Sequence, residues 1–317
     1  MAFDGWRKIL VNRLTITILI IFLLFLLGEV IFPGFMSLSH IMSILRLSVF
    51  LGIVALGQTL VVLSGNEGID ISVGSVVSLG VVVSAYILGG ENLKIPQALV
   101  LVPLMGFAIG LANGAGVSYL GIPPLVMTFA MGNVIEGLSL ILTKGFPTGQ
   151  APPLLEVIGS GRLFGLVPYL VILWIILSVI AVIMLGKTKW GNILYGVGTN
   201  SLAAELSGVM VKRFRMYVYA ICGATSALAG LLLLSYTGTP YLNLGAPYVM
   251  PSIVAVAIGG TSLAGGKGNY SGTAIGCVAL TTLNSILVAI QATEAIRQIV
   301  YGSLLLALIT VSERREG

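Results

Sequence analysis

Apolar residues are gathered along the chain into ten long runs, and short polar or glycine-rich segments separate one run from the next. A helix needs about 20 apolar residues to cross a hydrocarbon core about 30 Å thick, and most of the runs approach this length. We therefore predict an all-α fold, a polytopic transmembrane bundle in a single domain over residues 1–317. The expected spans are 14–32, 44–64, 70–89, 95–116, 122–142, 166–186, 216–236, 249–264, 270–290 and 295–312.

Basic residues are concentrated at three places along the chain, which indicates its orientation in the membrane. Because lysine and arginine are enriched in cytoplasmic loops, we place all three clusters and both termini in the cytoplasm. This requires an even number of spans before the central cluster and an even total, and six and ten satisfy it. The clusters are Arg7, Lys8 and Arg13; Lys187, Lys189, Lys212, Arg213 and Arg215; Arg314 and Arg315.

Composition supports a membrane protein surrounded by lipid and excludes several other classes. Hydrophobic residues make up 57% of the chain and charged residues 9%, with a mean hydropathy of +1.08, whereas soluble domains are about 25% charged. The net charge of +5 is explained by topology, so we expect no nucleic-acid partner. Cys222 and Cys277 lie in apolar runs without metal-ligand spacing, and we expect His40 to be solvated in an outward loop.

The first five and the last five spans are candidate related halves. Residues 137–143 in the fifth span resemble residues 302–306 in the tenth. Five spans per half would make the two halves inverted repeats. Of the outward loops, 144–165 contains three prolines, and we expect it to be irregular or partly re-entrant.

The chain contains no segment suited to bind a nucleotide. The longest stretch outside the predicted spans, 186–215, has about thirty residues and lacks a phosphate loop ending in Gly-Lys-Ser/Thr. We therefore expect no cofactor on this chain, and any ATP with its Mg²⁺ must be bound by another polypeptide. An enzyme is not expected either, because the sequence has no Ser/His/Asp set, no intramembrane Glu-x-x-His and no paired aspartates within one span.

The central loop, about 187–215, contains a Gly/Asn turn followed by a short amphipathic stretch that ends at a glycine. We predict a small helix capped by Asn200, with Leu202 and Leu206 on one face. The small side chains of Ala203 and Ala204 would let this helix enter a groove on a partner. From the residues alone, a docking helix and an ordinary connecting loop remain equal alternatives.

Four further segments carry a family resemblance. Together with the Gly-x-Asn and Ala-Ala-x-x-Ser-Gly pattern of the central loop, they resemble the permease subunits of ribose/xylose/arabinose-type ABC sugar importers. Each motif is weak alone, but five in the same order are specific, and the resemblance covers roughly positions 40 to 310. The segments are Gly68–Gly74, Gly110–Gly114 followed by Ile122–Thr128, and Ile258–Gly268 followed by Gly272 and Thr273.

This resemblance implies the transmembrane permease of an ATP-driven importer for a simple sugar or similar small polar solute. The implied partners are cytoplasmic ABC ATPase subunits, a periplasmic or lipoprotein solute-binding protein, and a second permease chain, identical or related. The implied location is the plasma (inner) membrane, where the chain contacts lipid. In such permeases the central cytoplasmic loop is the coupling helix, a role that we carry onto Gly198, Asn200, Ala203, Ala204, Ser207 and Gly208.

The chain departs from the family pattern at three places. The usual Gly-Gly-Ile-Asp opening appears as Asn66-Glu67-Gly68-Ile69-Asp70, and Glu136 replaces a common arginine. Residues 249–251, Val-Met-Pro, lie where an acidic residue is often found. These changes weaken any specific sugar assignment and are consistent with one member of a diverged permease pair.

Six polar residues are candidates for the translocation pathway. Asp70, with Ser72 beside it, either caps the helix that follows or turns polar groups toward a solute path at membrane depth. Glu136, with Asn133 one turn away, lies near the middle of a span, where an ionisable side chain is costly. It serves the pathway or a gate, forms a structural pair inside the bundle, or marks a misplaced span boundary. Two further candidates, at the cytoplasmic bend 258–268, are Thr261 and Ser262.

Two other functional classes remain open on these residues. Glu136 also fits an ion-coupled secondary transporter of a small polar solute, since such carriers place ionisable groups near the membrane midplane. A non-transporting membrane scaffold is the other alternative. The resemblance of the central loop to a coupling helix favours the ATP-driven class.

Overall fold

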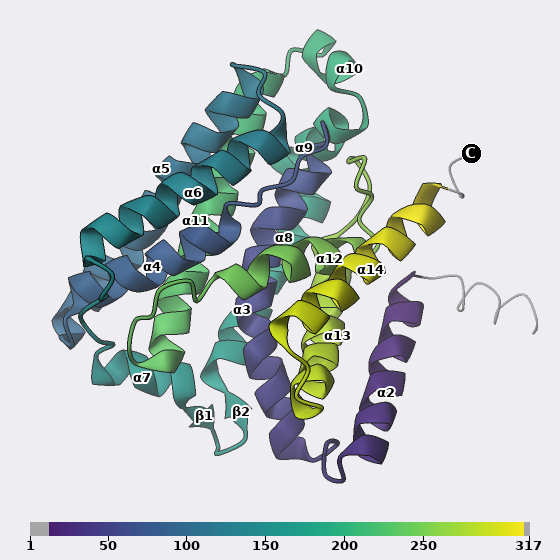
Figure 1. Ribbon diagram of the computed structural model, residues 1–317. Helices are drawn as coiled ribbons and strands as arrows, with labels where there is room; N and C mark the ends of the chain where they lie inside the picture. Colours follow the sequence, from purple (N-terminus) through teal and green to yellow (C-terminus); the bar gives the residue numbers. More distant parts are fainter. Residues whose placement is uncertain (1–12, 314–317) are drawn as a thin grey trace, which may run out of the picture.

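The computed structural model describes residues 13–313 as a bundle of helices (Figure 1). Helices account for 77% of the structure, which confirms the all-α prediction. The long helices are α2 (Arg13–Ile31), α3 (Leu38–Leu63), α4 (Val73–Leu88), α5 (Ile95–Ser118), α6 (Pro124–Thr143), α8 (Tyr169–Lys187), α11 (Val211–Thr237), α13 (Tyr270–Ala289) and α14 (Glu294–Glu313). The shorter elements are η1 (Asn92–Lys94), α7 (Pro153–Ser160), β1 (Arg162–Leu163), β2 (Val167–Pro168), α9 (Lys189–Thr199), α10 (Ser201–Leu206), η2 (Ala246–Tyr248) and α12 (Val249–Ile258).

Each of the ten predicted apolar runs overlaps one helix. Most boundaries agree within about three residues, but three of them differ by more than one helical turn. Helix α3 begins at Leu38 rather than 44, and α11 begins at Val211 rather than 216, because both helices continue into polar sequence that a hydropathy criterion leaves out. Helix α12 ends at Ile258 rather than 264, where the consecutive glycines that follow provide no side chains to extend it. The prediction of these boundaries was therefore wrong by about one to two turns.

Six helices of the described chain are long and apolar enough to cross a membrane: α3, α5 with η1, α6, α8, α11 and α13. Helices α2, α4 and α12 are apolar but shorter. The multi-pass expectation is therefore confirmed, whereas the number of ten spans remains a prediction. The orientation of the termini also remains a prediction, because Arg7, Lys8, Arg314 and Arg315 lie outside the described residues. The expectation that residues 1–317 form a single transmembrane domain also remains a prediction.

The centre of the bundle is formed by α3 and α11, against which α4, α5 and α13 pack (Figure 1). Glycines bring α5 and α11 into backbone contact. A Cβ atom at Gly110 would overlap the carbonyl oxygen of Tyr219, and one at Gly223 would overlap that of Gly106. Small residues therefore permit the close helix packing that the glycine content of the sequence indicates.

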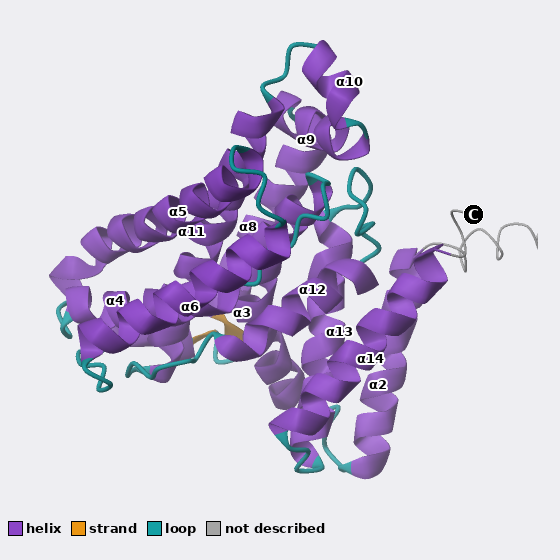
Figure 2. Cartoon of the chain, turned by 45° about the horizontal axis from the view of Figure 1, so that its top comes forward, coloured by secondary structure: helices purple, strands orange, loops and turns teal. Residues whose placement is uncertain are grey.

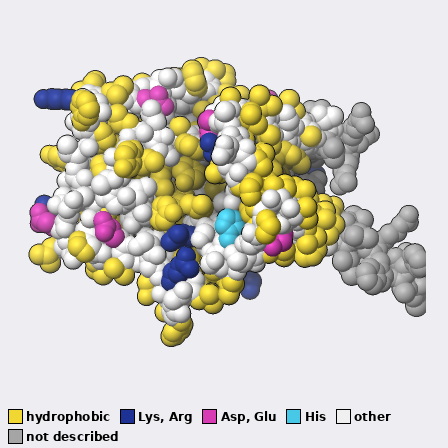
Figure 3. Space-filling model, turned by 60° about the horizontal axis from the view of Figure 1, so that its bottom comes forward, with side chains coloured by type: hydrophobic (Ala, Val, Ile, Leu, Met, Phe, Trp, Pro, Cys, Tyr) yellow, Lys and Arg dark blue, Asp and Glu magenta, His cyan; other side chains and the backbone are white. Residues whose placement is uncertain are grey.

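The surface of the bundle is largely apolar. Figure 3 shows hydrophobic side chains over most of one end of the molecule, with charged groups in a few small clusters. Large apolar side chains are also exposed along the sides of the helices, for example Phe22 in α2, Ile141 in α6 and Ile176 in α8. Such a surface is suited to lipid rather than to water.

Loops and short helices gather at the two ends of the bundle (Figure 2). Helices α9 and α10 lie at one end, and α7 with the β1–β2 hairpin lies at the other (Figure 1). The strands pair in antiparallel register, Arg162 with Pro168 and Leu163 with Val167. The expectation that the 144–165 loop is irregular was therefore wrong for its second half, which forms an ordered helix and the first strand of a hairpin. The alternative of a partly re-entrant loop remains a prediction.

The prediction for His40 was also wrong. The residue belongs to the first turn of α3 rather than to an outward loop, and it is only partly exposed. Its Nε2 lies 3.2 Å from Ser285 Oγ of α13, and its ring lies 4.5 Å from the ring of Phe35. The early start of α3 is what moves His40 into the bundle.

Candidate functional site

The central loop folds into two short helices joined at one residue. The Thr188 hydroxyl caps α9 by accepting a hydrogen bond from Gly191 N at 3.2 Å. Asn200 ends α9 and caps α10, with its Oδ1 accepting from Ala203 N at 3.0 Å. The predicted Asn200 cap is therefore confirmed, although the structure has a second helix, α9, before it.

Helix α10 projects from the end of the bundle (Figure 1). Its two leucines are exposed, Leu202 by 67% and Leu206 by 81%. Ala203, Ser207 and Gly208 are also exposed, and Ala204 is partly exposed. An exposed apolar face with small side chains beside it is suited to a groove on another protein.

One of the six predicted coupling residues lies apart from this surface. Gly198 is in the last turn of α9, where a Cβ atom would overlap the carbonyl oxygen of Leu63 at the end of α3. The structure thus brings Asn200, Ala203 and their neighbours together on α10, and places Gly198 inside, against the membrane helices.

Asp70 lies in the segment 64–72 between α3 and α4, and only 1% of it is exposed. Its Oδ1 accepts hydrogen bonds from Ser72 N at 2.9 Å and from Ser72 Oγ at 2.6 Å. Helix α4 begins at Val73 with Ser72 in the N-cap position. The alternative in which Asp70 is the N-cap residue was therefore wrong, because the helix begins later and Asp70 instead holds the turn that precedes it. The alternative of a role on the solute path remains a prediction.

Three helices surround this turn with polar side chains. Asn113 of α5 donates from Nδ2 to Ser72 Oγ at 2.9 Å. Gln58 of α3 pairs with the backbone of Asp70, donating to its carbonyl oxygen and accepting from its N–H, both at 3.2 Å. The thiol of Cys222 in α11 lies within hydrogen-bonding reach of the Asp70 carboxyl group. Asp70 thus belongs to a closed polar cluster that fastens segment 64–72 between α3, α5 and α11.

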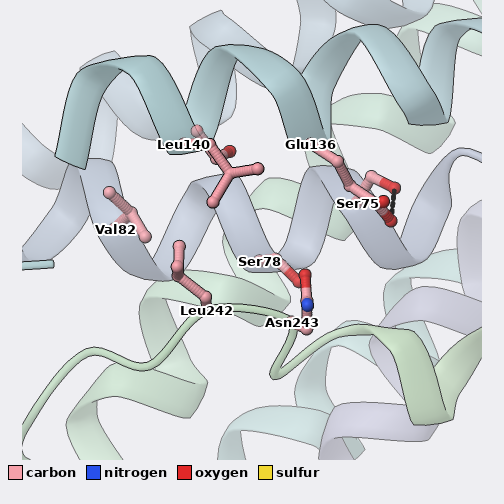
Figure 4. Close-up of a pocket in the computed structure, with 8 residues that line it drawn as sticks. Ser75, Ser78, Val82, Glu136, Leu140, Leu242 and Asn243 are labelled. Atoms are coloured by element: carbon pink, nitrogen blue, oxygen red, sulfur yellow. Dashed lines mark hydrogen bonds between the residues drawn. The ribbon is translucent and has the colours of Figure 1, made fainter. Parts of the chain in front are cut away.

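A small cavity lies between α4, α6 and the segment that precedes η2 (Figure 4). Across it, Ser75 of α4 donates a hydrogen bond from Oγ to Glu136 Oε1 of α6 at 3.2 Å. The cavity volume is ≈ 70 Å³, whereas sites for small molecules measure about 300–1,000 Å³. It is therefore too small for a sugar in this conformation. The lining residues are Ser75, Ser78, Val82, Glu136, Ser139, Leu140, Leu242 and Asn243.

Glu136 and Asn133 both lie on the exposed side of α6. Because α6 runs from Pro124 to Thr143, Glu136 is well inside a helix, which removes the alternative of a misplaced span boundary. Within residues 13–313 the ion pairs join Lys94 to Glu91 and Arg297 to Glu294, so Glu136 has no cationic partner in the described chain. Asn133 donates to the carbonyl oxygen of Phe129 in its own helix at 2.9 Å and does not line the cavity.

Thr261 and Ser262 lie in the glycine-rich loop 259–269 between α12 and α13. Thr261 is 3% exposed, and Ser262 N donates to the carbonyl oxygen of Lys267 at 2.8 Å. Neither residue lines the cavity. The six pathway candidates are therefore distributed over the Asp70 cluster, the exposed side of α6 and this loop.

Four polar lining residues were not singled out from the sequence. Ser75 and Ser78 follow Ser72 at intervals of three along α4, and Ser139 follows Glu136 at the same interval, so helical spacing could have found them. Asn243 lies in a loop far along the chain and carried no such signal. Among the described residues, no group of three or more His, Cys, Asp or Glu is placed to hold a metal ion.

Comparison with known proteins identifies the family. The model of the family described as "Branched-chain amino acid transport system / permease component" matches residues 40–309. Ribose import permease protein RbsC of Escherichia coli (strain K12) is 34% identical over 289 residues, 90% of this chain and 88% of that protein. RbsC of Bacillus subtilis (strain 168) is 32% identical over 94% of this chain and 92% of its own length.

A further relative is the autoinducer 2 import system permease protein LsrD of Photorhabdus laumondii, 32% identical over 82% of this chain and 78% of that protein. No solved structure gives a significant match. The protein is a multi-pass protein of the plasma (inner) membrane and a permease component rather than an enzyme. The chain therefore belongs to the family of permease components that the description "Branched-chain amino acid transport system / permease component" names.

Proposed function

We propose that this chain is the transmembrane subunit of an ATP-driven ABC importer for a simple sugar or similar small polar solute. The relatives named above as ribose and autoinducer 2 import permeases support this class of substrate. Hydroxyl, amide and carboxylate groups around the cavity are suited to a solute rich in hydroxyl groups. The observation that carries the proposal is the exposed apolar face of α10 at one end of a membrane bundle.

In the proposed topology the chain crosses the membrane ten times, with α4 and α12 as partial spans. Each would be completed at membrane depth by the segment before it, 64–72 for α4 and 238–248, which includes η2, for α12. Both segments have exposed residues, which at that depth would have to line the water-filled path. Thr17 near the start of α2 donates to the carbonyl oxygen of Ile258 at the end of α12, at 3.4 Å. The end of α12 leads into loop 259–269, which contacts α9 of the central loop. Because the proposed topology places the central loop in the cytoplasm, the start of α2 beside α12 supports a cytoplasmic N-terminus.

A second permease chain, identical or related, would cover the exposed side of α6. Glu136 lies on that side within the span, and an acidic group facing lipid at that depth would cost about 3 kcal/mol. The cost is avoided if this side of α6 lines a water-filled path shared with another permease. Glu136, Ser75 and Asn133 would then face the solute from one wall of the path.

The proposed mechanism is alternating access. ATP and Mg²⁺ bind to partner ATPase subunits, whose closure displaces α10, and the displacement opens the cavity to one side of the membrane at a time. A solute-binding protein delivers the solute at the opposite end of the bundle. Contacts between permease and solute can remain weak, because the binding protein supplies the affinity.

The docking role of α10 is tested by placing charge on its small face. We expect Ala203→Glu with Ala204→Glu to abolish both co-purification of the ATPase and uptake of labelled sugars, beginning with ribose. Ala295→Glu, at an exposed position in the first turn of α14, is the matched control and should leave both unchanged. Retention of association and uptake by the double variant would show that the docking role is wrongly assigned.

The class of transporter is tested separately in vesicles. Uptake that requires ATP and is indifferent to ionophores would support the proposal. Uptake driven by an ion gradient would select the ion-coupled carrier, for which the exposed Glu136 is the favouring observation. A complete absence of flux with every sugar tested would favour a membrane scaffold.

A further inference from the structure

Three segments that are distant in the sequence meet at four glycines, Gly65, Gly198, Gly265 and Gly266, which we call the glycine junction. A Cβ atom at Gly198 would lie 2.6 Å from Gly266 N, and one at Gly65 would lie 2.9 Å from the carbonyl oxygen of Gly198. A Cβ atom at Gly265 would lie 2.5 Å from Gly65 Cα. The backbones of α9, segment 64–72 and loop 259–269 are therefore in direct contact.

Hydrogen bonds surround the glycine junction and bind the same three segments together. Gly266 N donates to the carbonyl oxygen of Leu63 at 3.0 Å, which joins the loop to the end of α3. Tyr195 of α9 donates from its hydroxyl to the carbonyl oxygen of Gly268 at 2.8 Å. Burial raises the pKa of Tyr195 above its ordinary value, so this hydroxyl remains protonated and able to donate.

Two of these segments lead directly to the cavity. Segment 64–72 continues into α4, which carries Ser75 and Ser78. Loop 259–269 follows α12, which is preceded by η2 and, before η2, by the cavity residue Asn243. The two routes meet again beside the cavity, where Gly245 N donates to Ser78 Oγ at 2.9 Å. A Cβ atom at Gly245 would overlap the carbonyl oxygen of Gly74, so backbone again packs against backbone.

We infer that the glycine junction transmits the displacement of α9 and α10 to α4, which lines the cavity, and to α12, which follows the segment that lines it, and so couples nucleotide-driven motion to opening. This inference rests on the function proposed above. Gly65, Gly198, Gly265 and Gly266 are then positioning residues, since they act on the pathway through the helices and touch no solute.

The contact is suited to transmission because little in it can yield. Flexible side chains absorb small shifts by changing rotamer, whereas backbone atoms in contact must move together. Within segment 64–72, Gly65, Asn66 and Glu67 take positive φ values of 73°, 59° and 54° in succession, a left-handed conformation that is costly for the two non-glycine residues. At its other end, Ile71 N donates to Thr128 Oγ1 of α6 at 3.1 Å, which ties the segment to the second wall of the cavity.

Two glycines of α9 provide a matched pair of variants. Gly198→Ala inserts a methyl group into the glycine junction, whereas a Cβ atom at Gly196, two residues earlier in the same helix, meets nothing within 4 Å. Both substitutions raise the helix propensity of α9 by a similar amount, because each replaces glycine with alanine, and neither alters the exposed face of α10. Only the first should disturb transmission.

The readout is the accessibility of the cavity, which requires no knowledge of the solute. A cysteine introduced as Asn243→Cys at the exposed rim of the cavity is modified with a membrane-impermeant thiol reagent, with and without ATP and Mg²⁺, in vesicles that contain the permease and its ATPase. The native Cys222 and Cys277 are buried and should remain unmodified. In the Gly196→Ala background we expect the modification rate to change at least about tenfold with ATP, equivalent to about 1.4 kcal/mol.

With Gly198→Ala, we expect the ATPase to remain bound and to hydrolyse ATP while this ATP-dependent change in the modification rate disappears.

Tyr195→Phe is a second test of the glycine junction, for the case in which the Gly198→Ala variant fails to assemble. It keeps the backbone of α9 intact and removes only the hydroxyl. We expect it to reduce the ATP-dependent change by half or more. An unaltered change in Tyr195→Phe, or in an assembled Gly198→Ala complex, overturns the inference. No ATP-dependent change even with Gly196→Ala would instead overturn the proposed function.

Discussion

Two acidic side chains, Asp70 in the segment before α4 and Glu136 on the neighbouring helix α6, have opposite surroundings. The Asp70 carboxylate is enclosed by Ser72, with Asn113 and Gln58 completing the cluster, and it is 1% exposed. Glu136 is exposed and has one hydrogen bond, from Ser75. The comparison separates an acidic group that holds the bundle together from one whose partners lie outside the chain.

The two environments are only one helical turn apart on α4. Ser72 points into the closed cluster, and Ser75, three residues later, reaches the cavity. A buried acceptor stabilises the fold when all of its donors are in place, and removing it leaves those donors unpaired. An exposed acidic group in a span contributes little to stability, so its presence there points to a functional role. Stability and transport should therefore respond differently at the two positions.

The largest effect is expected at Asp70. Asp70→Ala leaves Ser72 N and Ser72 Oγ without their acceptor in a buried site, which costs about 1–3 kcal/mol for each group. We expect a lower thermal unfolding temperature in detergent and little folded protein in the membrane. Asp70→Asn keeps an oxygen at the acceptor position and should retain most of the stability. If Asp70→Ala unfolds at the unaltered temperature but transports nothing, Asp70 belongs to the pathway and the contrast with Glu136 is wrong.

At Glu136 we expect the reverse pattern. Glu136→Leu should lower ATP-dependent sugar uptake about tenfold, equivalent to about 1.4 kcal/mol. Its unfolding temperature should be equal to or above that of the unaltered protein, because a charge is removed from an exposed position in a span. Glu136→Gln keeps an acceptor for Ser75 and separates charge from hydrogen bonding. A marked fall in unfolding temperature for both variants would assign Glu136 a structural role.

The smallest effect is expected at Ser75. Ser75→Ala removes the one hydrogen bond that crosses the cavity to Glu136, a contact of about 1–2 kcal/mol. We expect uptake to fall a few-fold and ATPase association to be unaffected. Ser43→Ala is the control, because the Ser43 hydroxyl donates to the backbone of its own helix, α3, and does not line the cavity. Equal losses for the two variants would argue against a specific role of the Ser75–Glu136 pair.

The sequence predicted those features that depend on local composition. Ten apolar runs were each matched by a helix, and the capping role of Asn200 followed from its place before a short amphipathic stretch. The glycine junction could not be predicted, because it consists of backbone contacts among segments up to about 200 residues apart. Of the cavity residues, the sequence predicted Glu136 as part of a pathway. Asn243 could not be predicted, because only tertiary packing brings its loop to the cavity.

The hypothesis of inverted repeats remains a prediction, but the fold supplies a physical feature that bears on it. In each set of five predicted spans the third helix is short, α4 in the first set and α12 in the second. Each follows an irregular segment, and those segments are 64–72 and 238–248. In the similar stretches 137–143 and 302–306, a Cβ atom at Gly137 or at Gly302 would meet nothing within 4 Å, so neither glycine makes a close contact that would support the similarity.

The narrowness of the cavity has a consequence for the energy supply of the cell. Its ≈ 70 Å³ is room for a few water molecules, and Val82, Leu140 and Leu242 form apolar parts of its wall. A continuous file of water across the bilayer would let ions and protons leak and dissipate the electrochemical gradient. In this conformation the cavity is too narrow for such a file, so the water beside Glu136 need reach only one face of the membrane at a time, and the gradient is preserved.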